Sequence, residues 1–221
     1  HLRQPAPGGG RLMENACAAN PLHGYYKWHA RIYDATRWSF LFGRNRLLRL
    51  AADTLGPRRR TPVTLLEVGC GTGRNLARLA RLFPAASLTG IDLCRPMITR
   101  AARATTPHAP RCRLLCEAYG PESLPPASAD CIVFSYSLSM FNPGFDAALD
   151  AARSHLAPGG IVAVADFRRS AHPWFAAWMG VNHVRMDDHL LPALQARFDD
   201  VSLVSRKAYG GLWEYFVFLG R

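Results

Sequence analysis

Leu65-Leu66-Glu67-Val68-Gly69-Cys70-Gly71-Thr72-Gly73 is the stretch that decides the fold of this chain. An apolar run leads into a loop with glycine at three alternate positions, and a helical pattern follows from Asn75. This order predicts a strand, a tight turn and the start of a helix. Glycine lets the backbone turn sharply and lets a ligand approach without meeting a Cβ atom.

Two details of this loop narrow the choice of ligand. Glycines before a helix also occur in phosphate-binding loops and dinucleotide sites. No Lys-Ser or Lys-Thr follows Gly73, however, so a nucleoside triphosphate would lack its lysine. Glu67 at the loop entry would repel a pyrophosphate, but its carboxylate suits a cation such as the amino group of a zwitterionic ligand.

Two further acidic residues follow predicted strands. The stretch 87–92 predicts a second strand that ends in Asp92, which is placed to accept hydrogen bonds from both hydroxyls of a ribose. A third strand over 112–116 is followed by Glu117-Ala118. Glu117 is a candidate acceptor for an adenine amino group, so the three features together indicate an adenosine ligand.

Strands and helices alternate along the chain from residue 63. Such alternation predicts an α/β fold with a doubly wound, parallel sheet, and two late strands should form an antiparallel pair turned at 209–211. The expected strands are 63–68, 87–92, 112–116, 131–135, 160–166, 201–207 and 212–219; the expected helices are 44–55, 75–83, 96–105, 144–156, 173–181 and 187–198.

The glycine loop with Asp92 and Glu117 resembles the class I S-adenosylmethionine-dependent methyltransferases over roughly residues 60–167. The resemblance implies a Rossmann-like sheet with an antiparallel last strand, and S-adenosylmethionine as cofactor. The alternative is a Rossmann-type domain that uses NAD or no ligand. The cofactor-binding residues expected from the motifs and the resemblance are Arg37, Glu67, Gly69, Cys70, Gly71, Gly73, Asn75, Asp92, Leu93, Met97, Glu117, Ala118, Ser135 and Ser137.

Four other stretches are similar to one branch of that family, the enzymes that N-methylate the diacylglyceryl homoserine of betaine lipids. These stretches are 33–37, 135–140, 164–167 and 174–175. The resemblance implies methylation of an amino-acid-type amine, a 2-aminobutyrate or homoserine moiety, free or lipid-linked. The chain departs from the branch at Phe141-Asn142-Pro143, where that branch has Ile-Pro, so the acceptor stays open.

Two alternatives to N-methylation remain. The amino group of S-adenosylmethionine can attack its own γ-carbon, which gives azetidine-2-carboxylate and releases methylthioadenosine; such cyclases resemble the same fold family. A non-catalytic protein that binds the cofactor or a lipid surface is the third reading, and the acids at 67, 92 and 117 argue against it.

The aromatic N-terminal region predicts a lid. We divide the chain into a tail (1–19), a helical lid (20–60) and the cofactor-binding domain (61–221). The catalytic candidates are Tyr26, Tyr33, Trp38, Tyr136 and Asn142. The four aromatic residues among them would form a dry cage around the sulfonium and the acceptor. Plain core packing is the alternative for these rings. Arg37 is a candidate partner for a carboxylate or a solvated helix residue, and Arg44, Arg46 and Arg49 are expected to point outward.

Composition limits the partners. The formal net charge is +11, and residues 1–62 hold 11 Lys and Arg against 3 Asp and Glu. This bias favours peripheral contact with a membrane surface through 1–62, unless it is only a compositional preference for arginine. Basic and aromatic residues do not interleave as in RNA-binding proteins, so no nucleic-acid partner is expected. Six cysteines without metal spacing indicate a reduced, cytoplasmic protein without a metal site, and the sequence leaves the oligomeric state open.

Overall fold

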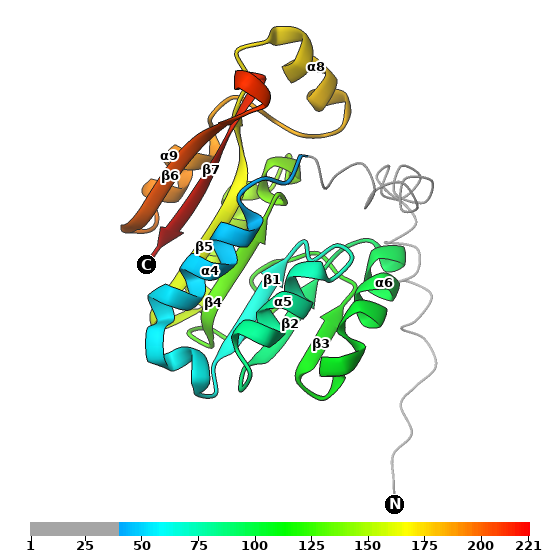
Figure 1. Ribbon diagram of the computed structural model, residues 1–221, viewed down its shortest axis with the longest axis vertical. Coiled ribbons are helices and arrows are strands. Elements are labelled where there is room, and N and C mark those ends of the chain that lie inside the picture. Colours follow the sequence, from blue (N-terminus) through cyan, green and yellow to red (C-terminus); the bar gives the residue numbers. More distant parts are fainter. Residues whose placement is uncertain (1–39) are drawn as a thin grey trace, which may run out of the picture.

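The computed structural model describes residues 40–221 as a single sheet covered by helices (Figure 1). Residues 1–39, and with them the predicted tail and half of the predicted lid, lie outside the described residues. The strands are β1 Thr64–Val68, β2 Ser87–Ile91, β3 Cys112–Leu115, β4 Ala129–Ser135, β5 Leu156–Arg169, β6 Asp200–Ala208 and β7 Trp213–Gly220. The α-helices are α4 Arg44–Leu55, α5 Arg74–Leu82, α6 Arg95–Thr105, α7 Phe145–His155, α8 Pro173–Val181 and α9 Leu190–Gln195. Short 3-10 turns are η1 Gly56–Arg60, η2 Thr106–Arg111, η3 Leu138–Met140 and η4 Tyr209–Gly211.

The sheet has the order β3-β2-β1-β4-β5-β7-β6. Strands β1 to β5 are paired in parallel, and β7 runs antiparallel to both of its neighbours, β5 and β6. The predicted doubly wound sheet with an antiparallel last strand is therefore confirmed. The chain builds outward from β1 to β3 and then returns to place β4 on the other side of β1. In sheets of this kind, ligands bind at the carboxyl ends of the strands where the order reverses.

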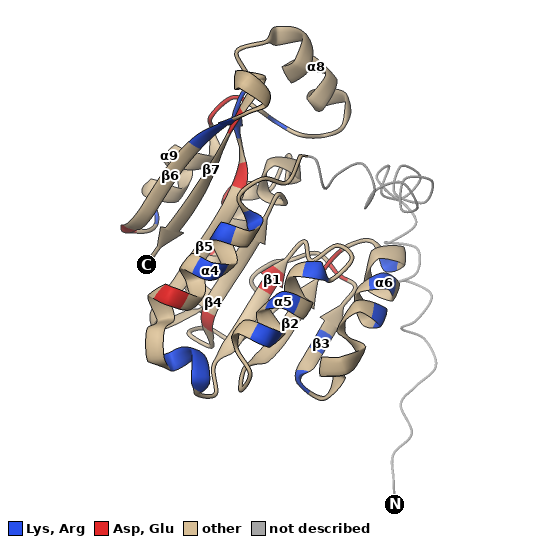
Figure 2. Cartoon of the chain, in the orientation of Figure 1, with Lys and Arg blue, Asp and Glu red and all other residues tan. Residues whose placement is uncertain are grey.

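Apolar side chains on both faces of the sheet hold the helices in place. One buried cluster joins α4, α5 and α8 to the sheet, and another joins α7 and α9 to its opposite face. The central strands are accordingly apolar on both sides: the stretch 131–134 in β4 is fully buried. Figure 2 shows Lys and Arg along α4, α5 and α6.

Helix α4 belongs to this packed layer. Its residues Leu47, Leu48 and Ala51 are fully buried against the sheet, while Arg46 and Arg49 are exposed as the helical pattern predicts. Gly56 ends the helix at a φ of 53°, a conformation that favours glycine. The structure thus places α4 in the helical layer, and the lid prediction rests on residues 20–39.

Two elements differ from their predicted bounds by three or more residues at each end. Strand β5 starts at Leu156 rather than at residue 160, because Leu156 already pairs with Ala129 across an irregularity in β4. Helix α9 covers only Leu190–Gln195 instead of 187–198. Its expected first turn is taken up by a bridge between Asp187 and Arg169 at the end of β5. Among residues 40–221, no helix has the length and apolar character that crossing a membrane requires.

Candidate functional site

The glycine loop connects β1 to α5, and all three glycines have positive φ: 71° at Gly69, 53° at Gly71 and 76° at Gly73. A Cβ atom on Gly69 would lie 2.5 Å from Cβ of Ser137, and one on Gly73 would lie 2.8 Å from Cα of Ala101. These two glycines allow the loop to pack closely on its neighbours. A Cβ on Gly71 would meet nothing within 4 Å. Gly71 is therefore the position at which the backbone faces open space and can be approached by a ligand.

Asp92 follows β2 and is tied to this loop. Its Oδ2 accepts a hydrogen bond from the Gly71 N–H at 2.8 Å, and its Oδ1 accepts one from the Cys94 N–H at 2.8 Å. Burial raises the pKa of Asp92, against the lowering effect of these two bonds. Each carboxylate oxygen can accept a second hydrogen bond. The Asp92 carboxylate can therefore still accept the two hydroxyls of a ribose.

Glu67 at the end of β1 is almost fully buried, with 1% of its surface exposed. Its Oε1 accepts a hydrogen bond from Nδ2 of Asn75 in the first turn of α5, at 2.8 Å. Its Oε2 is buried without a hydrogen-bond partner among the described residues. Burial raises the pKa of Glu67 to about 8, against the lowering effects of Asn75 and of the Arg44 charge. The site thus holds an acceptor whose ionised form a ligand cation would stabilise.

Ser135 at the end of β4 supplies a second buried oxygen on the same face. Glu67 pairs with Val133, and Ser135 comes two residues later, so both side chains project from one side of the sheet. Like Glu67 Oε2, Oγ of Ser135 has no hydrogen-bond partner among residues 40–221. Buried polar groups are normally hydrogen-bonded. Two such oxygens on neighbouring strand ends, next to the glycine loop, make this position a candidate binding site for a polar ligand.

Arg44 is a candidate site residue that the sequence interpretation missed. It is the first residue of α4 and is half-buried, whereas the helical pattern predicted that it points outward. Its positive charge lowers the pKa values of both Glu67 and Tyr136, although burial raises both overall. The preceding Gly43, with a φ of 79°, was the available signal that a tight turn brings the start of this helix over the sheet.

The remaining predicted cofactor residues differ in how accessible they are. Leu93, directly after Asp92, exposes 43% of its surface, which suits an apolar contact with a flat ring. Glu117 and Ala118 are exposed as well. Met97 is buried in α6. Two others are not open to a ligand: Cys70, within the loop, is buried, and Oγ of Ser137 donates a hydrogen bond to the Val68 carbonyl at 2.9 Å.

Two of the predicted catalytic residues lie on the turn after β4. Tyr136 has a φ of 58° and is buried; its hydroxyl donates to the Phe42 carbonyl at 2.7 Å. Its ring packs edge-to-face on Phe167, with the ring centroids 4.7 Å apart. Asn142 is exposed, and its Nδ2 donates to the Ser139 carbonyl at 2.8 Å. Their roles in catalysis stay predictions.

The other predicted site residues, Tyr26, Tyr33, Arg37 and Trp38, lie outside the described residues. Within residues 40–221, no group of three or more His, Cys, Asp and Glu side chains is arranged to hold a metal ion.

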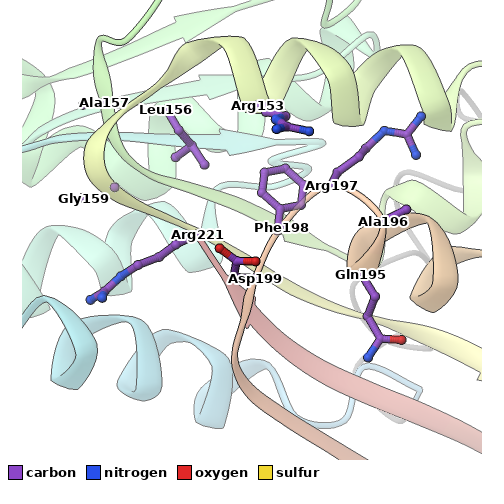
Figure 3. A pocket seen from close by; sticks show the side chains of 11 residues that line it. Arg153, Leu156, Ala157, Gly159, Gln195, Ala196, Arg197, Phe198, Asp199 and Arg221 are labelled. Atoms are coloured by element: carbon purple, nitrogen blue, oxygen red, sulfur yellow. The ribbon is translucent and has the colours of Figure 1, made fainter.

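A pocket of about 420 Å³ lies elsewhere, at the amino end of β5 (Figure 3). This is the edge of the sheet opposite the glycine loop, because β1, β4 and β5 run in parallel. The pocket is lined by Arg153, Leu156, Ala157, Gly159, Gly160, Gln195, Ala196, Arg197, Phe198, Asp199 and Arg221, and none of the predicted site residues is among them.

The glycine loop, β2 and β4 all lie within one segment that matches a family of known proteins. Residues 65–160 match the family model described as "Methyltransferase domain". Trans-aconitate 2-methyltransferase of Streptomyces avermitilis is 32% identical over 104 residues, which are 47% of this chain and 39% of that protein. Malonyl-[acyl-carrier protein] O-methyltransferase of Dechloromonas aromatica is 35% identical over 104 residues, 47% of this chain and 36% of that protein. The chain thus matches less than half the length of these curated relatives.

A solved structure has a fold similar to that of the described residues. It is the 1,6-didemethyltoxoflavin-N1-methyltransferase of Burkholderia thailandensis, with bound 1,6-didemethyltoxoflavin and S-adenosylhomocysteine. The TM-score is 0.70 at 18% identity, and the match covers 99% of this chain and 92% of that chain. The comparisons thus show a match of residues 65–160 to the methyltransferase-domain model, and a fold shared with this solved structure.

Proposed function

We propose that this chain binds S-adenosylmethionine at the carboxyl ends of β1, β2 and β4 and transfers its methyl group to an amino-acid-type amine. The observation that carries the cofactor assignment is the buried, unpartnered Oε2 of Glu67 beside the open backbone of Gly71. When bound, this cofactor supplies an electrophilic methyl group on a sulfonium. Glu67 would hold its ammonium group, Arg44 its carboxylate and Asp92 its ribose.

The turn after β4 supports an amine as the acceptor. Tyr136 and Phe167 form an aromatic, buried wall there, and Asn142 adds a neutral polar group. An apolar surrounding favours the neutral form of an amine, which is the nucleophilic form. Methyl transfer then depends on alignment and the exclusion of water, without a dedicated base. A 2-aminobutyrate or homoserine moiety, free or lipid-linked, is the acceptor that the similarity to the betaine-lipid branch supports.

The relatives named above raise a competing acceptor. One is named for trans-aconitate and the other is an O-methyltransferase named for malonyl-[acyl-carrier protein]. The solved structure, in contrast, is named as an N1-methyltransferase. A carboxylate acceptor would need a compensating cation, because burying a charge without a partner is costly. The experiment must therefore offer an amine and a carboxylate side by side.

The test incubates the purified chain with S-adenosylmethionine in four separate reactions and analyses the products by mass spectrometry. The additions are homoserine, diacylglyceryl homoserine in vesicles, trans-aconitate, and none. S-adenosylhomocysteine together with N-methylated homoserine or its lipid supports the proposal. The two amine reactions distinguish a free acceptor from a lipid-linked one.

Other products would redirect the assignment. Methylated trans-aconitate would replace the amine by a carboxylate acceptor. Methylthioadenosine and azetidine-2-carboxylate from the cofactor alone would make the chain a cyclase instead. If no reaction consumes S-adenosylmethionine, although calorimetry shows that it binds, these acceptors are wrong. An Asp53→Asn variant, which changes an exposed acid on α4, is the matched control for variants of the site acids.

A further inference from the structure

Asp166, near the end of β5, is a fully buried carboxylate that the proposed chemistry does not use. Its Oδ2 accepts a hydrogen bond from the Ser139 N–H at 3.1 Å, and its Oδ1 accepts one from the Phe167 N–H at 2.8 Å. No Lys, Arg or His of residues 40–221 forms a salt bridge with it. Burial raises its pKa to about 6. A buried carboxylate without an ion pair is costly, so its hydrogen bonds to the backbone are what keep it in place.

Ser139, the first partner of Asp166, connects three segments through its backbone. It lies in η3, on the turn that follows β4, and is fully buried. Its N–H donates to Asp166, while its carbonyl accepts from Nδ2 of Asn142 at 2.8 Å and from the Arg185 N–H at 3.0 Å. The orientation of Asn142 is therefore set by a residue that Asp166 holds on its other side.

Phe167, the second hydrogen-bond partner of Asp166, contacts Tyr136. The Phe167 ring packs edge-to-face on the Tyr136 ring at 4.7 Å. The Tyr136 N–H also donates to the carbonyl of Ala165, the residue before Asp166, at 2.7 Å. The three residues 165–167 thus fix both the backbone and the ring of Tyr136.

From these contacts we infer that Asp166 is a positioning residue for the acceptor side of the site. The Asp166 carboxylate accepts hydrogen bonds from two backbone N–H groups. One belongs to Ser139, whose carbonyl binds Asn142, and the other belongs to Phe167, whose ring contacts Tyr136. Asn142 and Tyr136 are the two described residues predicted to act on the acceptor. Asp166 is buried below the turn and acts through Ser139 and Phe167, without contact to the acceptor. The effect of Asp166 on catalysis rests on the proposed function. Its effect on the positions of Ser139 and Phe167 can be tested without any activity.

The test uses Asp166→Asn, which keeps the shape of the side chain. An amide has one accepting oxygen, and its NH₂ group faces the second N–H, so either Ser139 or Phe167 loses its acceptor. We expect hydrogen exchange over residues 137–142 to become at least 10-fold faster. Exchange over the glycine loop, 69–73, and the dissociation constant of S-adenosylhomocysteine should change less than about twofold. Asp146→Asn, an exposed acid of α7, is the matched control.

Unchanged exchange over 137–142, or an increase spread equally over 69–73, would overturn the inference. If Asp166→Asn does not fold, Asn142→Ala tests the same group of hydrogen bonds around Ser139 from its exposed side. It should accelerate exchange over 137–142 and also over 184–186, because Arg185 shares the Ser139 carbonyl; no change in either segment would overturn the link.

Activity then separates this inference from the proposed function. If the parent consumes S-adenosylmethionine, Asp166→Asn should lower kcat at least 10-fold and change KM for S-adenosylmethionine less than threefold. A rise in KM for S-adenosylmethionine as large as the drop in kcat would make Asp166 a general structural residue. A parent without turnover would contradict the proposed function, while the exchange result would still decide the positioning role.

Discussion

Asp92 and Gly71 follow different strands, yet Oδ2 of Asp92 accepts the Gly71 N–H at 2.8 Å. The acid that would hold a ribose and the loop that would receive the rest of the cofactor are therefore one connected unit before any ligand binds. Because the other oxygen of Asp92 accepts the Cys94 N–H, the carboxylate is fixed at both ends. Such preorganisation lowers the entropic cost of binding.

Glu67 predicts a specific dependence of stability on pH. Its pKa is raised by burial to about 8 from a usual value of 4.5. Between these pH values the folded chain holds a proton that the unfolded chain releases, so the free energy of unfolding falls as pH rises through this window. Glu67→Gln removes this loss. Without ligand, the variant should gain more in Tm relative to the parent at pH 8 than at pH 5.

The difference between the two gains should be at least ~2 °C, which corresponds to about 1 kcal/mol for a chain of this size. Thermal unfolding followed by circular dichroism measures it. Glu122→Gln, an exposed acid, should shift neither midpoint. Equal gains for Glu67→Gln at both pH values would show that the Glu67 carboxyl is not protonated in the folded chain.

Arg44 should recognise the carboxylate of the cofactor. Loss of a charge-assisted hydrogen bond costs ~1.5–3 kcal/mol, so Arg44→Ala should weaken S-adenosylmethionine and S-adenosylhomocysteine roughly 10- to 150-fold. Methylthioadenosine has no carboxylate, and its affinity should stay within about twofold. Calorimetry with the three ligands checks this, with Arg46→Ala on the exposed side of α4 as control. An equal loss for all three ligands would reduce Arg44 to a structural role.

Tyr136 should distinguish the charged cofactor from its neutral product. An aromatic face near a sulfonium contributes ~0.5–2 kcal/mol, a gain that S-adenosylhomocysteine lacks. Tyr136→Leu should therefore weaken S-adenosylmethionine roughly 2- to 30-fold more than S-adenosylhomocysteine. Tyr136→Phe loses only the bond to Phe42 and should keep the parent ratio. If Tyr136→Leu weakens both ligands equally, the ring serves packing alone.

Cofactor binding should slow hydrogen exchange only in residues 20–39 of the predicted lid. Residues 20–39 should exchange amide hydrogens more slowly when S-adenosylhomocysteine is bound. Helix α4 is packed in the core, and its buried residues should exchange equally with and without ligand. Hydrogen exchange with mass spectrometry resolves the two segments. Equal exchange of residues 20–39 in both states would make that segment a fixed part of the fold.

Local patterns predicted most of the fold because the central strands β1 and β4 are short apolar runs, each followed by a clear turn signal. The spacing from the glycine loop to Asp92 likewise sufficed to predict the acid at the tip of β2, which the structure joins to the loop. Helix α9 was predicted too long, since pairing of Asp187 with β5 depends on a contact between distant segments.

The site was predicted less completely for the same reason. Arg44 was expected in solvent because a helical pattern reports which face is apolar and does not report what lies beyond the first turn. Asp166 was seen only as part of the stretch 164–167. Its role depends on Ser139, 27 residues earlier, and no local pattern reports that contact.

Calorimetric titration of S-adenosylmethionine into the parent and into Asp92→Ala tests the central claim most directly. If Asp92 and the glycine loop form the cofactor site, the parent binds and the variant loses ~1.5–3 kcal/mol, roughly 10- to 150-fold in affinity. Asp53→Asn should bind like the parent. A parent that does not bind S-adenosylmethionine, or an Asp92→Ala variant that binds it as tightly as the parent, would contradict the account.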